Sequence, residues 1–159
     1  MSFDDWLLAL HVLSAFALVA ALVVFWVAIV ALRRTDLPEQ ALAAGALMKA
    51  GSIVVVVGSL GVIVFGVWLA IALDGIEVWN AWVIAAIVLW AIASETGRRS
   101  GEEYMPTFAR AGELVAAGNL GPDAELAKLA RTQRGLALHT IASVLTLLIL
   151  VDMIWKPGA

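Results

Sequence analysis

Two histidines lie inside long apolar segments, where few other side chains offer any chemistry. His11 falls within residues 6–32 and His139 within residues 135–155. An imidazole titrates near physiological pH and is the commonest metal ligand in proteins. Ionisable residues inside a membrane helix are rare and usually functional. His11 and His139 are therefore candidate cofactor-binding residues, either as ligands of haem iron or as groups that transfer protons.

The expected depths of the two histidines in a membrane differ. Counted at about 1.5 Å per residue, His11 lies roughly 33 Å from Arg33, and His139 lies roughly 8 Å from Arg134. The two imidazoles are expected in opposite leaflets, about 20 Å or more apart in depth even when the helices tilt. One chain then supplies only one ligand to any given haem, so a bis-histidine haem requires a second copy or a membrane partner.

A carboxylate is expected near the depth of His139. Glu95 lies three residues before Arg98, which places it about 5 Å from the same boundary. Glu95 and His139 are therefore candidate partners in a proton relay. The alternative for Glu95 is an ion pair at the membrane surface with Arg98 or Arg99.

Asp152 is expected near the depth of His11, but it points away from the helix face that carries His139. An i, i+4 pair with Lys156 at the interface is the favoured interpretation for this carboxylate. For both histidines, two further uses remain open. One is a hydrogen bond to a quinone or a lipid headgroup, and the other is a purely structural hydrogen bond to a neighbouring helix, worth about 1 kcal/mol.

The composition favours a bilayer as the solvent for this chain. Of 159 residues, 63% are hydrophobic and 14% are charged, against about 45–50% and about 25% in typical soluble domains. There are no cysteines, which excludes disulfides and thiolate metal sites. No phosphate-binding loop, GxSxG or HExxH motif is present. Basic residues are dispersed among acidic ones, so we expect no nucleic-acid partner.

Four segments are long and apolar enough to span a membrane, which takes roughly 20 residues as a helix. They cover residues 6–32, 52–73, 78–96 and 135–155. The sequence therefore predicts an all-α, integral membrane four-helix transmembrane bundle. We expect residues 1–159 to form a single membrane domain, with residues 97–134 as a cytoplasmic loop.

The distribution of basic residues predicts the orientation. Nine of the ten Lys and Arg residues fall on the side of the 97–134 loop, and the positive side of a membrane protein is cytoplasmic. Both termini are then expected outside a bacterial plasma (inner) membrane. An aromatic belt is expected at the outer boundary, formed by Trp6, Trp68, Trp79, Trp82 and Trp155. The acidic N-terminus and the length of the first run favour a retained helix over a signal peptide.

Small residues recur every seven positions in the second segment. The stripe is Gly45, Ser52, Ser59 and Gly66. A strict seven-residue repeat of small side chains favours close packing of one helix against a neighbour. A permeation path along the same stripe is the alternative.

Local signals mark the ends of the helices. Asp36 and Glu39 have the spacing of a capping box at the start of the second helix, and Asp123 is expected to cap a helix that runs straight into the fourth span. Asp74 and Gly75 predict a tight hairpin between the second and third spans. A weakly amphipathic helix is expected over residues 102–117.

The first helix, WLLALHVLSA over residues 6–15, and the closing DMIWKPGA over residues 152–159 resemble a bacterial family of small integral membrane proteins of unknown function. That family is distantly similar to the copper-resistance D and protoporphyrinogen-oxidase-J membrane families. The resemblance implies that His11 matches their first-helix histidine and that haem b is the candidate cofactor. The third span lacks the mid-membrane lysine of the oxidase, so the resemblance implies a haem site without that enzymatic activity.

Two classes of function therefore remain. The first is a small polytopic plasma-membrane protein that handles haem or protons through its intramembrane histidines. The second is a non-catalytic helical scaffold or a subunit of a larger complex. The expected partners are the lipid bilayer and either a second copy of the chain or another membrane protein.

Overall fold

The computed structural model describes residues 3–72 and 79–155. Its helices are α1 (Phe3–Arg34), α2 (Pro38–Ala72), α3 (Ala81–Ala116), α4 (Ala124–Ala130) and α5 (Gln133–Trp155). Within the described residues, four segments are long and apolar enough to cross a membrane, namely α1, α2, α3 and Ala124–Trp155. The predicted all-α four-helix bundle is confirmed. The predicted hairpin at Asp74 and Gly75 lies outside the described residues.

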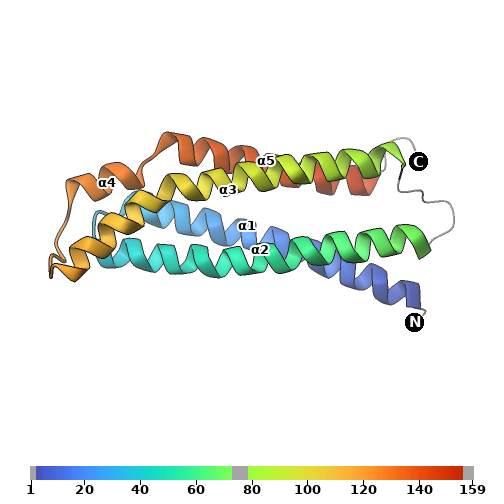
Figure 1. Ribbon diagram of the computed structural model, residues 1–159, viewed down its shortest axis with the longest axis horizontal. Coiled ribbons are helices and arrows are strands. Elements are labelled where there is room, and N and C mark those ends of the chain that lie inside the picture. Colours follow the sequence, from blue (N-terminus) through green and yellow to red (C-terminus); the bar gives the residue numbers. More distant parts are fainter. Residues whose placement is uncertain (1–2, 73–78, 156–159) are drawn as a thin grey trace.

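The helices are arranged as two antiparallel pairs. The most extensive contacts are those of α1 with α2 and of α3 with α5, and α2 also contacts α3. Figure 1 shows the two pairs lying along one long axis, with α4 at one end. The start of α1 and the end of α5 both lie at the other end of the bundle (Figure 1). An even number of long helices therefore returns the chain to the side on which it began.

Most of the apolar surface of the long helices is exposed. Only 11% of the most apolar stretch of α2 is buried, and only 22% of the corresponding stretch of α1. A water-soluble bundle would hide such surface, because exposing it to water is costly. Lipid therefore covers these faces. Four of the five tryptophans predicted as an aromatic belt are exposed, Trp82 being the buried exception.

The tightly packed core lies toward the α4 end of the bundle. Its largest members are Tyr104, Ile29, Leu32 and Leu126, all fully buried. These side chains come from the end of α1, the second half of α3, and α4. A conventional core thus ties the helices together at one end, whereas lipid contact dominates along the rest.

Polar groups hold α4 against α3. Asp123 accepts a hydrogen bond from the Leu126 backbone N–H at 2.7 Å, which confirms the predicted cap. The helix does not run straight into the fourth span, because α4 ends at Ala130 and α5 begins at Gln133. Arg110 of α3 donates to the same carboxylate at 3.0 Å. The Arg110 guanidinium and the Leu126 N–H hold the pKa of Asp123 below its usual value. At the start of α2, the residue before the first helical residue is Leu37, whose backbone oxygen accepts from the Ala41 N–H. The N-cap position is therefore Leu37, one residue after the predicted Asp36.

The third predicted span and the predicted amphipathic helix form one continuous element. α3 contains 36 residues, which corresponds to about 54 Å at 1.5 Å per residue. The hydrocarbon core of a bilayer is about 30 Å thick. α3 therefore extends well beyond the membrane, and much of the expected loop is helical.

The small-residue stripe of α2 does not face a single neighbour. Gly45 approaches Phe108 of α3, and Ser59 accepts a long hydrogen bond from Trp90 of α3 at 3.5 Å. Gly66 instead approaches α1, and Ser52 is exposed. The predicted stripe is thus divided between two neighbours.

Two small residues of α2 that contact α1 lie one position before Ser52 and Ser59 of the predicted stripe. Gly51 and Gly58 are buried seven residues apart, facing α1. A Cβ at Gly58 would lie 3.1 Å from both the Leu18 side chain and the Ser14 backbone oxygen. Since the backbone oxygen has no rotamer to change, glycine is what permits this approach.

We expect Gly58→Leu to force α1 and α2 apart and to lower thermal stability in mild detergent. Overpacking of this kind typically costs about 1–3 kcal/mol. The matched control is Gly101→Leu, because a Cβ at Gly101 meets no atom within 4 Å. Circular dichroism melts of the two variants test the expectation, and equal melting temperatures would contradict it.

Candidate functional site

His139 is enclosed within the bundle. Its side chain on α5 is 5% exposed, and its ring meets Trp26 of α1 edge-on at 4.8 Å between centroids. The centroid of the Phe25 ring lies 6.0 Å from the centroid of the His139 ring. Nε2 of His139 is buried and has no hydrogen-bond partner among the described residues. His139 therefore lies in an aromatic, apolar environment with one polar atom unsatisfied.

A short chain of hydrogen bonds joins α1 to α5 beside this ring. The Trp26 indole N–H donates to Ser143 Oγ at 3.0 Å, and Ser143 Oγ donates to the His139 backbone oxygen at 2.8 Å. His139 and Ser143 are both buried. The sequence analysis did not single out Trp26. The signal was available, because an indole N–H away from the membrane interface requires a polar partner.

His11 is bonded to the backbone of α2. Its Nδ1 lies 3.1 Å from the carbonyl oxygen of Val62. A carbonyl oxygen only accepts, so Nδ1 carries the hydrogen, and Nε2 of the neutral ring keeps its lone pair. Gly66 lies one helical turn beyond Val62, and a Cβ there would be 2.8 Å from the imidazole. The absence of a side chain at Gly66 therefore lets the ring reach the carbonyl.

The structure does not bring the two histidines together. His139 contacts Trp26, which lies fifteen residues beyond His11 along α1. That spacing corresponds to about 22 Å along the helix axis. The two imidazoles of one chain therefore lie at different levels along the bundle.

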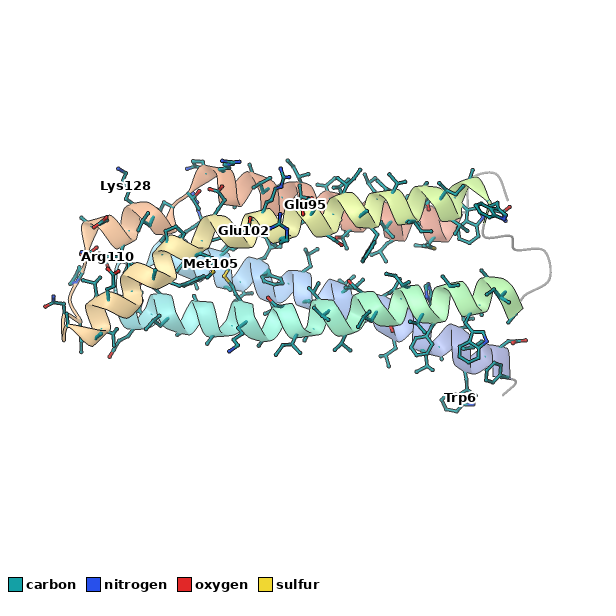
Figure 2. All side chains as sticks on the ribbon, viewed as in Figure 1. Trp6, Glu95, Glu102, Met105, Arg110 and Lys128 are labelled. Carbon is teal, nitrogen blue, oxygen red and sulfur yellow. The ribbon has the colours of Figure 1, made fainter. Side chains whose placement is uncertain are left out.

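Glu95 pairs with arginines of its own helix. Its carboxylate forms a bidentate ion pair with Arg98, with both N–O distances at 2.9 Å, and a second pair with Arg99 at 2.7 Å. The Glu95 side chain is 45% exposed (Figure 2). The contacts of this carboxylate are thus those of the interfacial alternative.

The reason is the face of α3 on which Glu95 lies. A Cβ at Gly97 would lie 3.9 Å from Ala142 of α5, and Ser100 donates a hydrogen bond to the Gly135 backbone oxygen. At about 100° per residue, Glu95 lies on the opposite side of α3 from Gly97 and Ser100. Its carboxylate therefore points away from the surface of α3 that meets α5.

The remaining candidate carboxylate is Asp152 on α5. Its Oδ2 is buried and lacks a hydrogen-bond partner within the part of the chain that the structure describes. The expected pair with Lys156 lies outside the described residues. No three His, Asp or Glu side chains gather as a metal-binding group in residues 3–72 and 79–155.

The two histidines differ in their fit to haem iron. Nε2 of His139 is covered by the protein itself, so a metal has no access to this nitrogen in this arrangement. His11 is only partly buried, and its Nδ1–H is held by a carbonyl. Ligating histidines commonly donate their other ring N–H in this way. The protein thus engages one ring nitrogen of His11 and encloses Nε2 of His139.

The fold and the exposed apolar faces define a class, that of small polytopic helical membrane proteins. Comparison with protein-family models, curated proteins and solved structures finds no match. No family is identified.

We expect Ser143→Ala to destabilise the protein in detergent, because it leaves the partly buried indole N–H of Trp26 without its acceptor. In a double-mutant cycle with Trp26→Phe, the coupling should be about 0.6 kcal/mol and at most about 1.7 kcal/mol, the range for hydrogen bonds between membrane helices. Thr140→Ala is the control, since Thr140 is exposed and bonds only its own helix. Additive effects of Ser143→Ala and Trp26→Phe would show that the bond contributes nothing.

Proposed function

We propose that this protein is a membrane haem-binding protein in which His11 supplies one axial ligand. The observation that carries the proposal is the hydrogen bond from His11 Nδ1–H to the Val62 carbonyl. This bond selects the tautomer whose Nε2 lone pair is available, and it fixes the orientation of the ring. Haem b held by two imidazoles supplies one-electron transfer.

The second ligand comes from outside the chain. His139 contacts Trp26, which lies about 22 Å from His11 along α1, and Nε2 of His139 is covered. His11 of a second copy is the simplest source, because a twofold axis brings the same residue of both chains to one iron. A histidine of a different membrane protein is the other source.

The test is an absorption spectrum of the protein purified in mild detergent, recorded oxidised and reduced. We expect a Soret band that is lost in His11→Ala and retained in His139→Ala. If two copies share the group, pyridine haemochrome analysis should give one haem for two chains. Circular dichroism confirms that each variant remains helical.

Two outcomes contradict this proposal. One is a colourless wild-type protein after expression with added haem precursor. The other is a Soret band that survives in His11→Ala, which would assign the ligand to another residue.

A helical scaffold is the second candidate function. It is favoured by the position of both histidines at contacts between helices. His11 of α1 bonds α2, and His139 of α5 contacts α1. In that case imidazoles serve as polar links within the bundle. A colourless protein whose His11→Ala variant melts at a lower temperature would support this function.

We further propose that the protein resides in a bacterial plasma membrane with both chain ends outside. Two observations support this orientation. The start of α1 and the end of α5 lie at one end of the bundle (Figure 1), and Arg33, Arg34, Arg110 and Lys128 lie toward the α4 end. Short positively charged segments remain on the cytoplasmic side.

Because the chain has no cysteine, single-cysteine variants report the orientation directly. We expect Asp5→Cys to react with a membrane-impermeant maleimide on intact spheroplasts. Asn119→Cys, in the turn between α3 and α4, should react only after permeabilisation. The reverse pattern would place the α4 end outside.

A further inference from the structure

A shallow, open groove on one face of α1 combines apolar side chains with a cation at one end. It is lined by Trp26, Val27, Val30, Ala31 and Arg34, with a volume of about 410 Å³. Val27 and Val30 are among the exposed apolar side chains of the bundle. The groove runs about 12 Å along the helix from Trp26 to Arg34, at 1.5 Å per residue.

Arg34 is the charged group of this groove. Its neighbour Arg33 donates to the Thr132 backbone oxygen at 3.0 Å. Arg34 is exposed and makes no ion pair within residues 3–72 and 79–155. A guanidinium offers a planar set of donors that suits a phosphate group. The end of the groove therefore has a charge that an anion complements.

A second groove on α2 repeats the same arrangement. It is lined by Lys49, Ser52, Ile53, Val56 and Val57, with a volume of about 300 Å³. Lys49 also makes no ion pair in the part of the chain that the structure describes. Arg34 is the last lining residue along α1 and Lys49 is the first along α2. The two helices are antiparallel and Gly51 of α2 meets Val24 and Phe25 of α1. Lys49 is therefore level with the Trp26 end of the α1 groove, about 11 Å from Arg34 along the bundle.

We propose that the α1 groove binds an anionic phospholipid, with its phosphate at Arg34 and an acyl chain along the apolar wall. Arg34 lies in the last turn of the first span, at the level expected for a lipid headgroup, whereas Lys49 lies about 11 Å deeper. A free phosphate would use only the cation and leave the apolar wall without an occupant. The open side of this groove faces the surrounding lipid, from which the ligand enters.

The experiment uses Trp26 as a reporter for the α1 groove. The full-length protein is reconstituted in phosphatidylcholine vesicles containing a small fraction of brominated-chain phosphatidylglycerol or brominated-chain phosphatidylcholine. Bromine quenches tryptophan fluorescence on contact. The fluorescence of Trp26 is obtained by subtracting the emission of Trp26→Phe from the emission of the wild type. We expect the anionic lipid to be preferred at Trp26 by about fivefold, the contribution of one basic residue near an anionic surface.

Arg34→Gln should remove that preference, and Arg34→Lys should keep part of it. Lys49→Gln is the matched control, because it removes the same charge from a different groove and should leave the Trp26 preference unchanged. Equal quenching by the two lipids in the wild type would overturn the proposal. Equal loss in Arg34→Gln and Lys49→Gln would also overturn it, because only a general surface potential would then be acting.

Discussion

In a bilayer, polar groups must find partners within the protein, whereas apolar side chains need not be buried at all. This constraint explains where the bundle is closely packed and where it is open. The spans leave most of their apolar residues exposed, and the contacts between them concentrate at glycines and at polar links. His11 with the Val62 carbonyl, and Trp26 with Ser143, are links of this kind. Each one joins two helices by satisfying a group that lipid cannot.

The same constraint separates the molecule into two regions along its length. Toward α4, the ends of α1 and α3 enclose a conventional core around Tyr104 and Leu126, with Asp123 and Arg110 securing α4. Away from α4, the helices contact one another at small residues such as Gly58, and lipid covers the rest. One end is therefore held together much as a soluble domain is, whereas the other depends on its bilayer.

The candidate chemistry follows from how each histidine satisfies its polar atoms. His11 uses one nitrogen on a backbone carbonyl and leaves the other as a lone-pair donor in a partly exposed position. His139 is enclosed by Trp26 and Phe25, and its Nε2 is covered. Two residues of the same type, both in apolar helices, thus differ in what they are able to bind. Packing, rather than residue type, makes this distinction.

The sequence by itself determined the class of the protein, because the length and hydropathy of a span are properties of one segment and require no knowledge of its neighbours. It also located the cap at Asp123, because an aspartate before a helix offers its side-chain oxygen to the free backbone N–H groups of the first turn. Only the tertiary structure decided which face of each helix meets which neighbour. Gly97 and Ser100 of α3 face α5, and Glu95 lies on the other side of α3 with its own arginines. Which faces meet depends on the side chains of two helices at once, and a pattern along one helix does not contain it.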